Sequence, residues 1–304
     1  MNGDISQNTI LSVIVPISSM AERLNLIQDW LKLLEFQPVE VIFVHDQNDM
    51  RTSLELNSLI STHQNNEIIF IEEKIGSPGL ARNRGLQVAS GDWVAFWDSD
   101  DEPNVIEILK ILADYQTTAN FDVIIGQFRV YDCEIKRLLP ERKPDLSMKA
   151  IAMNPGLWRM LFRRNIILSL KFNKFRMAED QNFLSDIMLP EKNVKIIKNI
   201  FYTYHINNEN QLTKNKDAIN EIVSAAAYTF TKIKSSKSIN KDFNCTLFAR
   251  QITTGIKKGS FLTKLNCVIL LSKALISSRI STSFDIIGNI VVLIFHRKIR
   301  KISS

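Results

Sequence analysis

Three carboxylates occur within four positions directly after an apolar run, in the stretch WVAFWDSDDEP. The side chains of Asp98, Asp100 and Asp101 would repel one another unless a cation lies between them. Mg²⁺ and Mn²⁺ prefer carboxylate oxygens and usually keep coordination positions open for water and phosphate. The spacing therefore predicts a divalent-metal site that involves Asp98 and Asp100. A helix cap made by Asp101 or Glu102, with Pro103 in the first helical turn, explains the same cluster equally well on spacing alone.

Over the first 130 residues, the spacing of apolar residues alternates between two patterns, which predict the elements that must position these carboxylates. Short apolar runs predict strands, and segments with steps of three and four predict helices between them. The predicted strands cover residues 11–17, 39–46, 67–73, 92–98 and 121–132. A capping box of Ser19 and Glu22 predicts the first helix, and a later helix is expected from about Pro78 to Ala89. This order predicts an α/β fold with a mostly parallel sheet covered by helices on both faces.

Polar or acidic groups follow three of the predicted strands. Pro16–Ser18 follow the first, Asp46 the second and Asp98–Asp101 the fourth. Open parallel sheets bind ligands outside the carboxyl ends of their strands. We therefore expect these groups to share one edge of the sheet, although capping of the following helix is the alternative for Asp46.

The second half of the chain has a different pattern. Residues 156–172 form an apolar and basic stretch that predicts an amphipathic helix, and Glu179–Asp180 open another predicted helix. One carboxylate suffices as a general base for a hydroxyl, and helix capping is the alternative explanation of the acidic pair. Residues 194–206 predict a strand, residues beyond 207 predict helices, and the Ser/Lys stretch at 232–241 predicts a linker.

The net charge of +6 hides an uneven distribution. Residues 232–304 contain 14 Lys/Arg and 2 Asp/Glu, so this part carries +12 and the remainder carries −6. An apolar segment at 286–295 followed by HRKIRK is typical of a helix at the surface of an anionic membrane. A helical subdomain with solvated charges fits the pattern equally well. Nucleic-acid binding is not expected, because few aromatic residues are interleaved with the basic ones.

The three cysteines, Cys133, Cys245 and Cys267, have neither zinc-site spacing nor the even number of a disulfide framework. The amino terminus has no secretory pattern, and no uncharged apolar run reaches the roughly 18 residues of a membrane-spanning helix. We therefore expect a reducing compartment and a cytoplasmic protein, peripheral on the inner face of the cell membrane if the basic tail binds lipid.

The stretch GSPGLARNRGLQVASGDWVAFWDSDD resembles the nucleotide-binding half of family 2 glycosyltransferases, which have the GT-A fold. Their pattern G-x-x-x-x-A-R-N-x-G, then A-x-G, then an apolar strand ending in D-x-D-D is present in order. The opening SVIVPI also resembles that family, but Ser18–Ser19 replace the usual Tyr-Asn. The usual Asp-Asp-Gly-Ser turn reads HDQND, which keeps Asp46 and places His45 at the first aspartate position.

The resemblance continues through the second half, to about residue 213. LWRMLFRR followed by AEDQNF resembles the acceptor-side pattern W-x-x-L-F-R-R followed by E-D, and YHINNENQLT (204–213) resembles the closing segment. It implies a GT-A domain over residues 1–213, with a nucleotide-binding part to about 130 and an acceptor part over 131–213. Residues 214–304 would be a basic helical extension.

The resemblance also implies roles for individual residues. Asp100 would bind Mn²⁺ or Mg²⁺ directly, and Asp98 would meet the ribose or a metal-bound water. Asp180 would be the catalytic base, with Glu179 beside it. The remaining nucleotide-binding residues would be Pro16, Ile17, Asp46 (accepting from a uracil N–H), Arg82, Asn83 and Ser99. His205 would contact phosphate or metal, although a lone histidine is more often structural.

These observations predict an inverting, metal-dependent glycosyltransferase that uses a UDP-sugar and a glycan or lipid-linked glycan acceptor, in bacterial surface-polysaccharide synthesis. G-x-G-x-x-G, P-loop and G-x-S-x-G motifs are absent from the sequence, which argues against a dinucleotide dehydrogenase, a P-loop NTPase and an α/β-hydrolase. The alternative is a non-catalytic scaffold of the same fold that binds a sugar nucleotide or a membrane.

Overall fold

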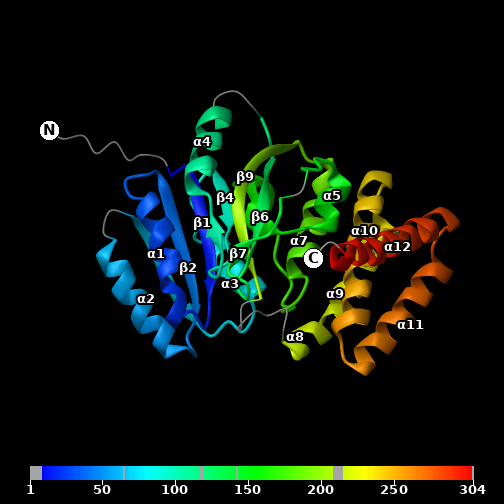
Figure 1. Ribbon diagram of the computed structural model, residues 1–304. Coiled ribbons are helices and arrows are strands. Elements are labelled where there is room, and N and C mark those ends of the chain that lie inside the picture. The colour runs from blue at the N-terminus through cyan, green and yellow to red at the C-terminus, as the bar shows by residue number, and fades with distance from the viewer. Residues whose placement is uncertain (1–8, 64–65, 117–119, 142, 208–214, 303–304) are drawn as a thin grey trace. The chain divides into compact units, whose positions relative to one another are not determined.

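The computed structural model describes residues 9–63, 66–116, 120–141, 143–207 and 215–302 (Figure 1). Its contacts divide the chain into two compact units. The first comprises residues 1–144, 157–169 and 193–208, and the second comprises residues 145–156, 170–192 and 209–304. The predicted boundary at residue 213 stays a prediction.

The first unit contains one mixed sheet in the order β3-β2-β1-β4-β8-β6-β9-β5, with β7 paired to β6. Its strands are β1 (Leu11–Ile17), β2 (Val39–Asp46), β3 (Glu67–Glu73), β4 (Trp93–Phe96), β5 (Glu102–Pro103), β6 (Val123–Asp132), β7 (Arg137–Leu138), β8 (Met160–Arg163) and β9 (Val194–Ile206). The first four are parallel, and β6 runs parallel to β9. The predicted α/β fold with a mostly parallel sheet is confirmed.

Helices cover both faces of this sheet, as expected. Val13 and Val15 of β1 share a core with α1 (Leu24–Leu33), α2 (Met50–Thr62) and α4 (Val105–Gln116). On the opposite face Gly85 of α3 (Pro78–Leu86) packs so closely on Ile14 that a Cβ there would lie 2.5 Å from its side chain. Alternate residues of β1 therefore enter two separate layers, as the period of a strand requires.

Residues 156–172, predicted as one helix, form something different. A 3₁₀ turn (Leu157–Arg159) leads into β8, and only a short helix α6 (Arg164–Ile167) follows. β8 pairs antiparallel with both β4 and β6, and its side chains are largely buried. Short apolar runs are ambiguous between helix and strand, and here pairing on both sides decides for the strand.

Two predicted helix caps are also wrong. Ser19 has a left-handed backbone (φ 57°), and α1 starts at Leu24 without a side-chain cap; the side chain of Glu22 lies outside the described residues. Asp101, Glu102 and Pro103 do not start α4, because Glu102–Pro103 form β5 and pair with β9. Asn104 caps α4 instead, and its Oδ1 accepts from the Glu107 N–H at 3.3 Å.

The second unit is helical. It comprises α5 (Met148–Met153), α7 (Glu179–Ile187), a 3₁₀ turn (Leu189–Glu191), α8 (Lys216–Asn220), α9 (Ile222–Ser235), α10 (Ser238–Lys258), α11 (Phe261–Ser277) and α12 (Ile280–Ile302). Phe230, Phe248, Cys267 and Ile286 belong to its core. The predicted linker at 232–241 shrinks to residues 236–237 between α9 and α10. In the described part beyond residue 207, all regular elements after β9 are helices, as expected.

A buried carboxylate fastens the amino-terminal edge of the sheet. Glu40 of β2 is 1% exposed, and its Oε1 accepts from the N–H groups of Ser90 and Gly91 at 2.6 and 3.2 Å. The Ser12 hydroxyl of β1 donates to the same oxygen. Glu40 thus joins β1, β2 and the turn that leads into β4.

Replacing Glu40 with alanine should lower the free energy of unfolding by about 2 kcal/mol, because buried N–H groups would lose their acceptor. Urea denaturation measures the change. Glu67→Ala, at an exposed position of β3, is the matched control and should change stability by less than about 0.5 kcal/mol. Equal effects of the two substitutions would contradict this role of Glu40.

Candidate active site

The carboxyl ends of six parallel strands meet at one edge of the sheet. Pro16 and Ile17 of β1 pair with Val44 and His45 of β2. Since β8 is antiparallel to both β4 and β6, the carboxyl ends of β6 and β9 lie at this same edge. The edge therefore gathers Pro16, Ile17, Asp46, the residues after β4 and His205 near the end of β9.

Asp98 is held from two sides. Arg82 of α3 is 6% exposed and donates from Nη2 to Asp98 Oδ1 at 2.9 Å. The Asp98 N–H donates to the hydroxyl of Tyr202 at 2.9 Å. The bond from Arg82 is charge-assisted and therefore stronger than a neutral one; it fixes the carboxylate of Asp98, and the bond to Tyr202 fixes its backbone.

Asp100 is less well compensated. Its Oδ2 lies 3.9 Å from Nη1 of Arg23, and 26% of its side chain is exposed. Burial, followed by the nearby charge of Asp98, raises the pKa of Asp100 above its ordinary value. A carboxylate whose ionised form is disfavoured in this way has reason to bind a cation.

Asp101 is the buried member of the cluster, with 1% of its surface exposed. Its Oδ1 accepts from the His205 N–H at 2.7 Å. Burial first, then the charges of Asp100 and Asp98, raise the pKa of Asp101 well above its ordinary value. Asp101 therefore fastens the loop after β4 to β9, and it is not a solvated helix cap.

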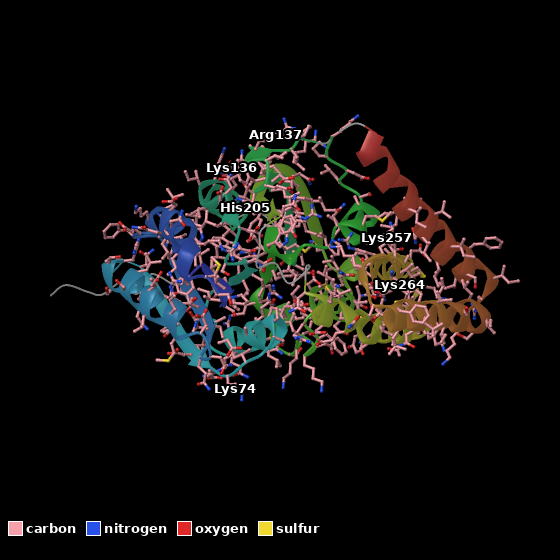
Figure 2. The ribbon with its side chains drawn as sticks, turned by 60° about the horizontal axis from the view of Figure 1, so that its bottom comes forward. Lys74, Lys136, Arg137, His205, Lys257 and Lys264 are labelled. Atoms are coloured by element: carbon pink, nitrogen blue, oxygen red, sulfur yellow. The ribbon has the colours of Figure 1, made fainter. Side chains whose placement is uncertain are left out.

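His205 completes this corner of the edge, where Figure 2 labels it. It is 5% exposed, its Nε2 lies 3.3 Å from Glu102 Oε1, and its ring centroid lies 5.1 Å from that of Tyr131. A hydrogen bond with His205, opposed by burial, lowers the pKa of Glu102. His205 therefore contacts the carboxylate cluster through both its backbone and its ring, while its contact with phosphate or metal stays a prediction.

The other predicted nucleotide-binding residues lie in the same unit. Asp46 Oδ2 accepts from the Gly76 N–H at 3.0 Å, and Oδ1 accepts from Asn48 Nδ2 at 2.7 Å. Asp46 does not cap α2; Asp49 does, by accepting from the Thr52 N–H. Asn83 is half-buried on α3, and Ser99 is buried beside Asp98.

The candidate base lies in the second unit. Glu179 and Asp180 form the first turn of α7, directly after Ala178, whose φ is +64°. Glu179 is buried, Asp180 is half-buried, and Asp180 Oδ1 accepts from the Gln181 N–H at 2.8 Å. A left-handed non-glycine residue is costly and often marks a functional site.

Buried polar contacts hold α7 against other helices of its own unit. Asn182 Oδ1 accepts from the Thr229 hydroxyl of α9 at 2.9 Å and from Gln251 Nε2 of α10 at 3.3 Å. Asp186, further along α7, accepts from Tyr228 of α9 at 2.8 Å. The helix that carries the acidic pair is therefore positioned by the carboxy-terminal helices.

Sequence reasoning missed two residues of the site. Tyr202 is fully buried, and burial, then Asp101 and Asp98, raise the pKa of its hydroxyl well above the ordinary value. Arg23 faces Asp100 from the segment before α1. Strand alternation within 194–206 points to Tyr202 as an inward residue, whereas nothing in the sequence around Arg23 links it to residues 98–101.

The donor set fits a hard divalent cation. Asp98 and Asp100 supply carboxylate oxygens, and burial, followed by the nearby charge of Asp98, raises the pKa of Asp100. Within the described part of the chain, no three His, Cys, Asp or Glu side chains gather as a complete metal cluster. Mg²⁺ usually binds to one or two carboxylates together with substrate phosphates and water, so two protein ligands suffice.

Comparison with known proteins now decides the family. The family model described as "Glycosyl transferase family 2" matches residues 12–183. The chain belongs to this family. Its fold is that of GT-A glycosyltransferases, as the resemblance of the strand that ends in D-x-D-D already indicated.

Curated relatives cover much of the chain at low identity. A cholesterol galactosyltransferase of Borreliella burgdorferi is 28% identical over 222 residues, which are 66% of this chain and 61% of that protein. TarP of Staphylococcus aureus, a poly(ribitol-phosphate) β-N-acetylglucosaminyltransferase, is 26% identical over 69% of this chain and 68% of TarP. The chain spans 30% of another relative, glycosyltransferase GlyA of Streptococcus pneumoniae.

Solved structures share the fold. TarS residues 1–349 of S. aureus, in complex with UDP-GlcNAc, matches with a TM-score of 0.61 at 16% identity over 93% of this chain and 90% of that one. A mannosyltransferase of Pyrobaculum calidifontis, in complex with GDP-Man and Mn²⁺, has a TM-score of 0.56 at 14% identity over 94% and 87% of the two chains.

Asp100→Asn should raise the thermal unfolding midpoint of the ligand-free protein at pH 7, because it removes a crowded charge. The pKa of Asp100 is higher in the folded than in the unfolded state, so its ionisation lowers stability as the pH rises above the ordinary value of 3.8. The gain should therefore be largest at pH 7 and shrink towards pH 4. Asp92→Asn, at an exposed position, is the control, and an equal gain at both pH values would contradict the prediction.

Proposed function

We propose that this chain is an inverting, metal-dependent glycosyltransferase that moves a sugar from UDP to a hydroxyl of a glycan or glycolipid acceptor at a bacterial surface polymer. The observation that carries the proposal is the cluster of Arg82, Asp98 and Asp100 at the ligand-binding edge of a family 2 fold. A Mn²⁺ or Mg²⁺ ion on Asp98 and Asp100 would act as a Lewis acid towards the diphosphate.

The chain's own groups would do the rest. Asp180 would take the proton of the acceptor hydroxyl, whose oxygen forms a bond to the anomeric carbon while the bond from that carbon to the diphosphate oxygen breaks. One base that acts opposite the leaving group inverts the anomeric configuration. Glu179 lies beside Asp180 in the same turn, and its burial suits a positioning role.

Relatives support the substrate classes. TarS was solved with UDP-GlcNAc, the relative from B. burgdorferi is named for transfer of galactose to cholesterol, and TarP is named for transfer to poly(ribitol phosphate). These acceptors are a sterol and a ribitol-phosphate polymer, and both offer hydroxyl groups. The Mn²⁺ in the mannosyltransferase structure supports the metal.

Asp180→Asn should lower turnover by about 10²–10⁴-fold, because the general base is lost, while the affinity for UDP with Mn²⁺ stays within about two-fold. Release of UDP from a panel of UDP-sugars, with and without EDTA, measures both the activity and its metal dependence. Asp186→Asn removes a charge from the same helix α7 and weakens its contact with α9. This variant is the control, because it shows how much turnover falls when only the position of the helix is disturbed. UDP binding without transfer or hydrolysis of any donor would favour the non-catalytic scaffold.

The carboxy-terminal helices support a place at the membrane. Apolar side chains of α12 stay exposed at steps of four and three: Ile280, Phe284, Ile287, Val291 and Ile294. Further exposed apolar residues lie on α11, including Phe261, Leu265 and Val268. Among the residues that the structure describes, no helix is both long and apolar enough to cross a membrane.

Charge favours lipid over a second copy as the partner of this apolar surface. Residues 232–304 carry +12, so two copies would bring like charges together, whereas anionic headgroups would neutralise them. Figure 2 shows Lys257 at the end of α10 and Lys264 on α11 among these cations. The side chains of the basic cluster at 296–301 lie outside the described residues. We therefore propose peripheral binding to an anionic membrane.

The double substitution of Phe284 and Ile287 by serine should lower binding to vesicles of phosphatidylglycerol and phosphatidylcholine at least ten-fold, because apolar area is lost from the lipid-facing surface. Co-sedimentation measures binding. Met50→Ser with Leu54→Ser, two exposed apolar positions of α2, is the matched control. Unchanged binding, or a shift from dimer to monomer in light scattering, would contradict a lipid partner.

A further inference from the structure

The guanidinium of Arg23 lies beside the candidate metal ligand Asp100 without a complete set of partners. Nη1 of Arg23 is buried, and among the described residues it has no hydrogen-bond partner. Its distance of 3.9 Å from Asp100 Oδ2 is too long for a hydrogen bond. A buried donor without an acceptor costs about 1–3 kcal/mol, so folding alone gives little reason to place Arg23 there.

The backbone before Arg23 is held firmly in place. The Ser19 N–H donates to Asp49 Oδ2 at 2.7 Å, and the Met20 and Ala21 N–H groups lie 3.0 Å from the buried Thr52 Oγ1. Asp49 and Thr52 belong to the cap and first turn of α2. The left-handed turn at Ser19 (φ 57°), which follows the carboxyl end of β1, is therefore fixed by α2.

The residue after Arg23 is equally fixed. Leu24 belongs to the core together with Ile27 and Leu31, on the same helix. The Arg23 N–H itself donates to the Met20 carbonyl at 2.8 Å. Arg23 thus extends from a rigid backbone, and 23% of its side chain is exposed. That arrangement suits a residue that binds a ligand, because its backbone loses little conformational freedom on binding.

The ion pair with Asp100 does not explain this preparation. Partly exposed ion pairs without a hydrogen bond stabilise a protein by about 0–1 kcal/mol. A diphosphate, in contrast, would supply acceptors to the guanidinium, whose planar shape matches phosphate in a two-point geometry that lysine lacks. Asp100 would then be free for a cation, while Arg23 neutralises the diphosphate that arrives with it.

We propose that Arg23 binds the diphosphate of the nucleotide donor and, in the ligand-free protein, serves as the counter-cation of Asp100. The assignment rests on the proposed function, because it requires a nucleoside diphosphate at this edge. It gives the segment before α1 a role in donor binding that the Ser18–Ser19 replacement in the family pattern would not suggest.

Calorimetric titration of the full chain tests the assignment. With Mn²⁺ in excess, Arg23→Ala should weaken UDP binding about 10–100-fold, and Arg23→Lys should retain part of the affinity. Uridine, which lacks phosphate, should bind to the wild type and to Arg23→Ala alike. Without nucleotide, Arg23→Ala should bind Mn²⁺ a few-fold more tightly, because the competing cation is gone. Arg84→Ala removes the ion pair between Arg84 of α3 and Glu73, and it is the control for loss of a positive charge.

The outcomes separate the two claims. Wild-type affinity for UDP in Arg23→Ala would overturn the assignment and leave the proposed function intact. An equal loss for UDP and uridine would also overturn it, because it would indicate general damage to the pocket. If the wild type bound neither UDP nor Mn²⁺, the proposed function and the assignment would fail together.

Discussion

The negative charges of Asp98, Asp100 and Asp101 repel one another, and groups from three separate segments hold them together at one strand end. Arg82 of α3 donates to the carboxylate of Asp98. From β9, the Tyr202 hydroxyl accepts from the Asp98 N–H, and the His205 N–H donates to the carboxylate of Asp101. Arg23, in the segment before α1, faces Asp100. No single element could compensate the cluster, so its existence depends on the whole topology of the first unit.

Strand direction is the decisive part of that topology. β9 can bond Asp101 only because its carboxyl end lies at the same edge as that of β4. β8 is antiparallel to both β4 and β6, so β4 and β6 run in the same direction. β9 is parallel to β6 and therefore also runs in the direction of β4. The segment that sequence reasoning took for a helix is therefore the one that brings the carboxyl ends of β6 and β9 to the site.

The sequence allowed prediction wherever a local pattern settled the structure. β1, β2 and β3 have the predicted bounds because each is a short apolar run that is paired locally along a parallel sheet. The motif around Arg82 and Asp98 was found through its resemblance to the family pattern. Prediction failed at β8, at the caps of α1 and α4, and at Arg23, where a partner that is distant in the sequence decides the conformation. Such partners leave no periodic signal in the chain.

The three carboxylates differ in how fully neighbouring groups compensate their charge, and this difference separates a structural role from a binding role. Asp101, the most buried carboxylate, accepts a short bond from the His205 N–H and ties two strands together, so its contribution is to the scaffold. Asp100 keeps a raised pKa, a part-exposed side chain and a counter-cation beyond hydrogen-bond distance. A site that must receive a cation and a polyanion together cannot be saturated beforehand, because every internal partner would have to be displaced. The remaining imbalance at Asp100 and Arg23 therefore lies where a donor and its metal would complete both.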